Sequence, residues 1–297
     1  MKTTNLFVSM LIAVSCVCLT GCYRDSVDDP TKENGDSTKE QIVIGEFSVS
    51  AYQKVMFSKG NLQYQASTDT WRFAPHQYDY VGKNNSLSSP SYSGWIDRLS
   101  WGIGDNPISD YYYNEVWKDW GENAIGDISS NVYRTLSGSE WDYLFNLRFD
   151  ADQLWSQGTV NGVRGVIILP DNFSKHLSVS WKAQAKNYET NTYSINEWTI
   201  MENGGAIFLP AANDDNTEGS YWSSTPPMGD YYYNDGVNYT YSYETYCLYF
   251  DDDYLDSKCL CFLFEYLYHG DYGPGHGAYG VLDGGTARRS VRLVKDL

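Results

Sequence analysis

Residues 133–145 of the chain read YRTLSGSEWDYLF, and the predicted fold begins from the pattern inside them. Ser137 stands three residues before Glu140, a spacing typical of a capping box, in which each side chain bonds the backbone N–H of the other. Trp141 follows, and the leucine and phenylalanine three and four residues later complete one apolar helix face. The segment predicts a helix whose apolar side packs into a core.

The same order of residues returns in SINEW, where Ser194 is the cap, and predicts a second, shorter helix that ends near residues 204–205. After each helix comes a glycine and an apolar run that ends in Leu-Pro, at residues 166–170 and 206–210. Because proline has no backbone N–H, it ends a strand ladder. Caps, core strands and their ends explain both repeats without any catalytic role.

On the N-terminal side of these helices, short alternating runs separated by Gly, Asn, Ser and Asp predict strands and hairpins. A last strand is predicted at residues 289–294, with Val291 and Leu293 on one face and Ser290 and Arg292 on the other. We expect the early sheet and this last strand to close one α+β domain over residues 42–297. The early strands are predicted at residues 42–49, 54–58, 61–65, 71–74 and 78–81.

Five segments together resemble the Fibrobacter succinogenes major paralogous domain: FSKGNLQYQ at 57–65, YRTLSGSEWDYLF at 133–145, GAIFLPAA at 205–212, YWSSTP at 221–226 and RRSVRLV at 288–294. That family is similar to the C-type-lectin-like fold in the form used by formylglycine-generating enzyme. The resemblance implies two short helices, small twisted antiparallel sheets and long loops in an extracytoplasmic module, and it implies no reaction. The expected scaffold residues are Trp141, Trp198, Trp222, Val291 and Leu293.

Composition limits the classes of partner. Among 297 residues, 21 Lys and Arg face 38 Asp and Glu, and the net charge of −17 argues against nucleic acid as the main partner. The 27 tyrosines outnumber the 11 phenylalanines, which indicates an aromatic, hydrated surface.

The first residues predict export. Residues 6–19 form an apolar run that is short for a membrane span and typical of a signal peptide. Leu19-Thr-Gly-Cys22 resembles the lipobox of bacterial lipoproteins, so residues 1–21 are the predicted signal peptide and Cys22 the lipidated N-terminus. An ordinary secretory signal is the alternative. Residues 22–41 predict a flexible tether, whose acidic residues resemble the surface-export signal of bacteroidete lipoproteins and favour a lipid-anchored, outward-facing place on the outer membrane.

Residues 221–287 hold about half of the tyrosines, mixed with Gly, Ser, Asn and Asp. This composition is typical of antibody paratopes, because tyrosine offers a large amphipathic area with few rotors. We expect this region to bind an external protein or glycan; a solvated loop without a partner is the alternative. The predicted contact residues are Tyr231, Tyr232, Tyr233, Asn234, Asp235, Asn238, Tyr239, Tyr241, Tyr243, Tyr249, Tyr254, Tyr266, Tyr268, His269, Asp271 and Tyr272.

The same region is poor in five residue types. Between residues 229 and 293, Lys, Glu, Gln, Met and Trp occur only as Glu244, Lys258 and Glu265. These five types cannot be reached by mutating the adenines of an Asn codon. The region therefore resembles the variable region of target proteins of diversity-generating retroelements, and chance composition is the alternative.

Cysteines and other reactive residues give weak signals for chemistry. Cys16 and Cys18 leave with the signal peptide and Cys22 carries the lipid, so three cysteines remain, and Cys247 can pair with either Cys259 or Cys261 across a hairpin. A zinc site is the weaker alternative.

No metal, cofactor or enzymatic activity is predicted. The spacing of Cys259 and Cys261 departs from the copper-binding pair of the formylglycine-generating oxidases, and no Gly-x-Ser-x-Gly elbow occurs. The run 251–253 with Asp256 predicts a solvated acidic hairpin tip in preference to a calcium site. A structural or adhesin subunit of the cell surface is the second functional hypothesis, and an oxidase is the third.

Overall fold

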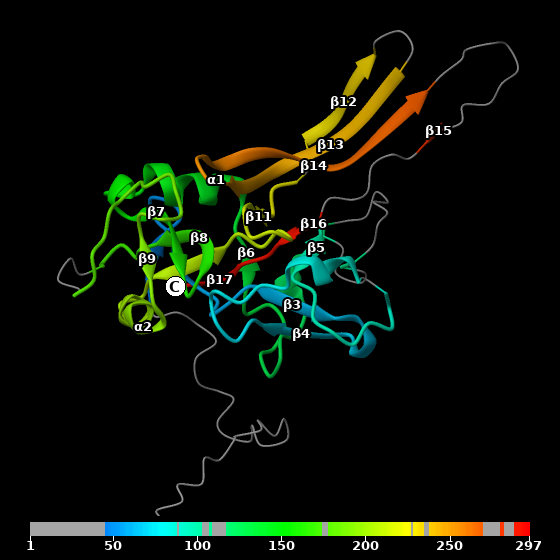
Figure 1. Cartoon of the computed structure of the whole chain (residues 1–297). Helices are drawn as coiled ribbons and strands as arrows, with labels where there is room; N and C mark the ends of the chain where they lie inside the picture. Colours follow the sequence, from blue (N-terminus) through cyan, green and yellow to red (C-terminus); the bar gives the residue numbers. More distant parts are fainter. Residues whose placement is uncertain are drawn as a thin grey trace, which may run out of the picture. The chain divides into compact units, whose positions relative to one another are not determined.

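Two α-helices and several small β-sheets make up the part of the chain that the structure describes (Figure 1). The computed structural model describes residues 45–87, 89–102, 107–108, 117–173, 178–226, 228–234, 238–269, 280–281 and 288–297, which belong to one compact unit, Thr38–Leu297. The architecture confirms the predicted α+β class. None of the described helices has the length and apolar composition of a membrane span. The predicted signal peptide, Cys22 and the tether lie outside the described residues.

Helix α1, Gly138–Asp142, begins at the predicted capping box. The Ser137 N–H donates to Glu140 Oε2 at 2.7 Å, and the Glu140 N–H donates to Ser137 Oγ at 3.3 Å. A π-helical turn, Tyr143–Leu147, continues the helix. Trp141 and the predicted leucine and phenylalanine of the same face are buried, so the predicted orientation is confirmed.

Helix α2, Ile195–Asn203, has the second predicted box, in which the Ser194 N–H donates to Glu197 Oε2 at 2.9 Å. It ends at Gly204, whose N–H bonds the carbonyl of Ile200, as the sequence predicts. Short 3-10 turns complete the helical segments, at Ala66–Thr68, Gly82–Ser86, Trp120–Glu122 and Ala151–Gln153.

The last strand of the chain joins the early sheet, as predicted. One four-stranded sheet has the order β1-β2-β17-β6, in which β17 pairs antiparallel with β2. The predicted strand at 289–294 is divided into β16 and β17, because the Val291 carbonyl accepts from the Leu62 N–H instead of continuing the ladder. The strands of this sheet are β1 Phe47–Ser48, β2 Lys54–Phe57, β6 Arg134–Thr135 and β17 Leu293–Asp296.

The two apolar Leu-Pro runs pair with each other. They form the neighbouring strands β8 and β10 in a sheet of order β10-β8-β7-β9, where Ile168 lies opposite Ile207. A separate hairpin consists of β3, Leu62–Gln65, and β4, Thr70–Phe73. The four strands of the sheet β10-β8-β7-β9 are β7 Trp155–Val160, β8 Val163–Ile168, β9 Thr192–Tyr193 and β10 Ile207–Pro210.

The predicted strand at residues 78–81 is wrong, because this segment is irregular. A turn closes between His76 and Asp79, and the Val81 N–H donates to a carboxylate oxygen of Asp97 at 2.9 Å instead of a strand carbonyl. A side-chain acceptor therefore takes the bond that a ladder would need.

The largest sheet contains the Tyr-rich region. Its order is β15-β14-β13-β11-β16-β5, and β12 pairs with β13 beyond the end of β11 (Figure 1). Residues 247–250 of β13 pair with β11, whereas residues 238–244 pair with β12 and β14. The strands are β5 Arg98–Ser100, β11 Gly219–Trp222, β12 Met228–Asn234, β13 Asn238–Phe250, β14 Leu255–His269, β15 Gly280–Val281 and β16 Arg288–Ser290.

Each predicted scaffold tryptophan lies in a different cluster of the core. Trp141, Trp222 and Trp198 are at most 1% exposed and belong to three separate groups of buried residues. Val291 and Leu293 are also fully buried, in the cluster of Trp222. The scaffold prediction is confirmed for all five residues.

The expectation that the many tyrosines form a hydrated surface is wrong for part of them. Among the described residues five tyrosines are buried, one of them at the start of the Tyr-rich region, so a high tyrosine count does not by itself indicate a hydrated surface. The hydroxyl groups of four of them donate hydrogen bonds inside the protein, as in Tyr221, which donates to the carbonyl of Pro210 at 2.8 Å. The five are Tyr64, Tyr133, Tyr188, Tyr193 and Tyr221.

Candidate functional site

Three strands carry most of the predicted contact residues. We call residues 231–234 of β12, 238–243 of β13 and 264–269 of β14 the outer ribbon (Figure 1). In its register Tyr241 lies opposite both Tyr232 and Tyr266. Directly opposed positions of antiparallel strands share one face of a sheet. One row of three tyrosine positions therefore crosses the ribbon on one face.

Alternation along the strands extends this row. Tyr239 lies opposite Tyr268 and Asn234, and Tyr243 lies opposite Phe264. Because positions two apart on a strand return to the same face, these residues share the face of the row. We call this set the tyrosine face: Tyr232, Asn234, Tyr239, Tyr241, Tyr243, Phe264, Tyr266 and Tyr268.

The register places the other predicted contact residues of the outer ribbon on the opposite face. Tyr231 pairs with Ser242, Tyr233 with Thr240, and Asn238 with His269. The run of three tyrosines at 231–233 is thus divided between the two faces. Sequence alone did not separate them, because strand register depends on the partner strand.

Tyr249 and Tyr254 lie apart from the outer ribbon, at the turn that joins β13 to β14. Tyr249 is six residues beyond Tyr243, a separation of roughly 20 Å along a strand. The Tyr249 hydroxyl donates to Asp251 at 3.1 Å, and burial raises the pKa of this phenol to about 12. Tyr254 is 48% exposed and donates to Asp256 at 3.2 Å. The structure does not bring these two predicted residues to the tyrosine face.

The acidic run forms the predicted hairpin tip. Asp251 Oδ1 accepts from the N–H groups of Asp253 and Tyr254, at 3.3 and 3.1 Å. The Gln157 amide donates to the carbonyls of residues 251 and 254 from the neighbouring sheet. The first carboxylate of the run thus shapes the turn, while Asp252 and Asp253 are exposed.

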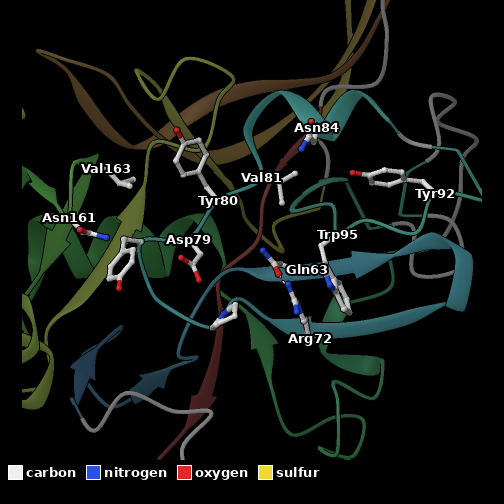
Figure 2. Close-up of a pocket in the computed structure, with 12 residues that line it drawn as sticks. Gln63, Arg72, Asp79, Tyr80, Val81, Asn84, Tyr92, Trp95, Asn161 and Val163 are labelled. Atoms are coloured by element: carbon white, nitrogen blue, oxygen red, sulfur yellow. Dashed lines mark hydrogen bonds between the residues drawn. The ribbon is translucent and has the colours of Figure 1, made fainter. Parts of the chain in front are cut away.

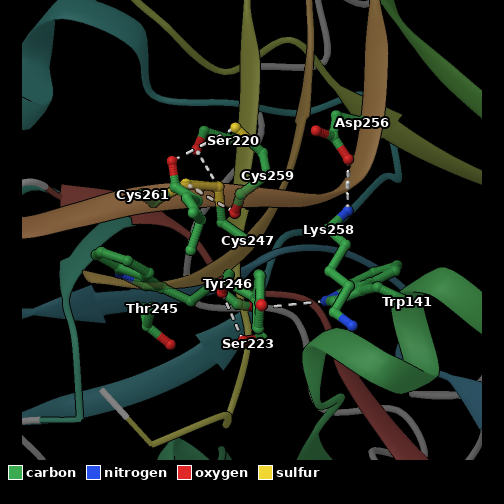
Figure 3. Close-up of a disulfide and its surroundings, with 12 residues drawn as sticks. Trp141, Ser220, Ser223, Thr245, Tyr246, Cys247, Asp256, Lys258, Cys259 and Cys261 are labelled. Carbon is green, nitrogen blue, oxygen red and sulfur yellow. Dashed lines mark hydrogen bonds between the residues drawn. A yellow bond between two sulfur atoms is a disulfide. The ribbon is translucent and has the colours of Figure 1, made fainter. Parts of the chain in front are cut away.

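A disulfide crosses the hairpin at the base of the outer ribbon (Figure 3). Cys247 pairs with Cys261, which is one of the two pairings that the sequence left open. Cys259 is the free thiol among the described residues, and its sulfur lies within 4.8 Å of the other two. Burial raises the pKa of Cys259, Asp256 raises it further and Arg289 opposes the shift. The protonated thiol is a poor nucleophile and a poor metal ligand.

We call the described residues outside the outer ribbon the body. The inner part of the hairpin is fixed to the rest of the body by polar contacts that the sequence did not reveal (Figure 3). Ser223 Oγ donates to the carbonyl of Tyr246 at 2.5 Å, and Thr245 Oγ1 donates to the carbonyl of Thr225 at 2.6 Å. A Cβ atom at Gly138 would lie 2.6 Å from Tyr246 Cβ, so helix α1 needs glycine there. Glycine at the first position of a capped helix is the available signal for such a close approach.

Comparison with known proteins adds no relative, since no family model, curated protein or solved structure matches the chain.

The predicted contact residues Asp235, Asp271 and Tyr272 lie outside the described residues. The site is therefore defined by the outer ribbon and its base.

Proposed function

We propose that this chain is a lipid-anchored protein of the bacterial outer surface, which binds an external protein or glycan through the tyrosine face. The observation that carries the proposal is the register: six tyrosines share one face of three strands. Tyrosine supplies contact area and a hydrogen-bonding hydroxyl at low entropic cost, which suits recognition of varied ligands. The apolar run at residues 6–19 and the lipobox that ends at Cys22 support the anchor.

The position of the face also supports a binding role. Strand β13 is held by β11 and by the disulfide over residues 247–250, and the outer ribbon continues beyond that support. Recognition is most specific where a rigid scaffold presents the contact residues. The proposal includes the C-type-lectin-like arrangement, which two short helices and small antiparallel sheets support at the level of class.

The proposal extends to variation of the tyrosine face among related genes. Three residues between 229 and 293 belong to the five scarce types. Glu244 and Lys258 lie outside the outer ribbon, and Glu265 pairs with Ser242 on the face opposite the tyrosine face. The tyrosine face therefore contains none of the five scarce residue types. A template repeat beside the gene, differing mainly at adenines, is the expected genomic observation, and differences at other bases among sister strains would contradict it.

Binding can be tested with two matched double variants. Tyr232→Ala with Tyr241→Ala removes two phenols from the tyrosine face, and Tyr231→Ala with Tyr233→Ala removes two from the other face. Wild-type protein is first applied to arrays of glycans and of secreted proteins, and each variant is then tested on the retained spots. We expect the first variant to lose more than tenfold in affinity and the second to stay within about threefold. Equal losses would refute a one-sided binding face.

A further inference from the structure

A cavity of about 550 Å³ lies on a different part of the molecule from the outer ribbon (Figure 2). The hairpin β3–β4 forms one side, the irregular segment after β4 forms the middle, and the β7–β8 turn closes the other side. Its volume falls within the range of ordinary small-molecule sites. The residues that the argument uses are Arg72, Asp79, Asn84, Tyr92, Trp95 and Asn161.

The guanidinium group of Arg72 is held in a fixed position in this cavity. Arg72 Nε donates to Gln63 Oε1 at 2.8 Å, and the guanidinium carbon lies 3.9 Å from the centre of the Trp95 ring. The stacking and the hydrogen bond together restrict the plane of the group. Among the described residues, the two terminal amino groups of Arg72 have no hydrogen-bond partner. They are oriented donors that a ligand can use.

Asp79 supplies an acceptor of opposite charge to the same cavity. Its Oδ2 accepts from the backbone N–H of His76 at 2.9 Å, and the His76 ring lies 3.1 Å from the same oxygen. Within the described part of the chain, Oδ1 accepts no hydrogen bond, and Asp79 forms no ion pair with Arg72. A donor group and an acceptor group thus line one cavity without satisfying each other.

A buried polar network fixes the wall between these groups. Asp97 is completely buried, and its carboxylate accepts from the Val81 N–H and from the Asn85 side chain, both at 2.9 Å. The Asn85 amide oxygen accepts in turn from the N–H groups of Asp97 and Arg98. The segment that carries Tyr80 and Asn84 is therefore tied to strand β5, and the cavity is formed before a ligand arrives.

We infer that this cavity binds a short neutral saccharide. Its two charged side chains, Arg72 and Asp79, have opposite signs, so one of them attracts a purely anionic or purely cationic ligand and the other repels it. Sugar hydroxyls both donate and accept, and can therefore satisfy Asp79, Arg72 and the amide groups of Asn84 and Asn161 together. Aromatic rings, among them Tyr92, offer apolar surface to the C–H faces of a sugar ring. The site is separate from the tyrosine face and does not depend on the proposed function.

The experiment uses the whole chain and six neutral trisaccharides that differ in monosaccharide or linkage: maltotriose, cellotriose, laminaritriose, xylotriose, mannotriose and N,N′,N″-triacetylchitotriose. Isothermal titration calorimetry measures each, with glycine and inorganic phosphate as zwitterionic and anionic probes. We expect at least one trisaccharide to bind, and Arg72→Gln to weaken that binding at least tenfold. Lys83→Gln is the matched control, because Lys83 is exposed, does not line the cavity and changes the charge equally.

Three outcomes would overturn the inference: no heat from any trisaccharide, unchanged affinity in Arg72→Gln, or tighter binding of glycine or phosphate than of every sugar. A second variant, Trp95→Phe, keeps an aromatic ring under the Arg72 guanidinium group. Circular dichroism of each variant distinguishes loss of the binding site from unfolding of the protein. The variant Tyr232→Ala with Tyr241→Ala is expected to bind the trisaccharide like wild type. Its failure to do so would place the sugar at the tyrosine face instead, so the two proposals can fail separately.

Discussion

Tyrosine has different surroundings in the body and in the outer ribbon. In the body, Tyr221 is fully buried, donates to the carbonyl of Pro210 at 2.8 Å and accepts from Asn61 at 3.1 Å. In the outer ribbon, the described residues pair with one another and with β15. Tyrosine therefore stabilises the fold in the body, and in the outer ribbon it is the residue type to which we assign recognition under the proposed function.

The largest effect is expected where the body supports the ribbon. Trp222→Ala removes an indole that is 1% exposed, that donates to the Leu99 carbonyl at 2.7 Å and that Arg289 covers at 4.9 Å. We expect the free energy of unfolding to fall by about 3 to 5 kcal/mol. Urea denaturation measures it, with Tyr254→Ala at the exposed turn as the control. Equal losses in both variants would remove the distinction between body and surface.

A second prediction concerns pH and the wall of the cavity. Burial raises the pKa of Asp97 to about 6 from 3.8, so the folded state binds this proton more tightly than the unfolded state. The stabilising contribution is complete below about pH 4 and is lost as the pH rises through 6, in total on the order of 3 kcal/mol. The pKa of Asp171 is shifted in the opposite direction. Burial raises this pKa, but hydrogen bonds from Ser48 and the charge of Arg148 outweigh burial and lower it below the ordinary value.

Denaturation at several pH values measures this contribution. Asp97→Asn is expected to lower stability at every pH, because an amide cannot accept both of the bonds that the carboxylate accepts. The variant should nevertheless lose less stability than wild type between pH 4 and 7. If the free energy of unfolding changed equally with pH in wild type and in Asp97→Asn, Asp97 would not titrate in this range.

Local patterns in the sequence predicted what local chemistry determines. The two capping boxes need only residues three positions apart, and both form as predicted at Ser137 and Ser194. The Leu-Pro strands and the buried tryptophans follow from apolar runs and helix periodicity in the same way. The class of the fold was therefore accessible from the sequence.

Contacts between distant segments were not accessible. The segment at 78–81 has a strand pattern, but the carboxylate of Asp97, sixteen residues from Val81, takes its backbone bond. The cavity joins Arg72 to Asn161, two residues that no sequence pattern connects. The choice between Cys259 and Cys261, and the division of the tyrosines between two faces, depend on strand register, which both strands set together.

A smaller effect is expected for a single hydroxyl in the body. Tyr221→Phe leaves the ring in place but removes the partner of the Pro210 carbonyl and of the Asn61 amide. Because both groups stay buried, stability should fall by about 1 to 3 kcal/mol. Tyr254→Phe is the matched control, since the hydroxyl of this exposed tyrosine bonds only Asp256 among the described residues. Thermal unfolding that moves equally in both variants would contradict the structural role of the buried hydroxyl.

The smallest effect on global stability is expected in the outer ribbon itself. Tyr241→Ala removes the centre of the cross-strand row, where each pair contributes about 0.2 to 1 kcal/mol to local pairing. Within the described part of the chain, residues 238–244 of β13 pair with β12 and β14 alone, whereas residues 247–250 also pair with β11 and are joined to β14 by the disulfide. We therefore expect the ribbon to open without unfolding of the body.

Hydrogen exchange distinguishes these two levels of opening. In Tyr241→Ala we expect amides of residues 238–243 to exchange faster, while amides of 247–250 keep their protection and the global free energy of unfolding changes by less than about 0.5 kcal/mol. Tyr233→Ala, on the opposite face, is the control for loss of a phenol from the same ribbon. If protection at 247–250 fell together with protection at 238–243, the ribbon and the body would form one cooperative unit, and the tyrosine face would have a structural role after all.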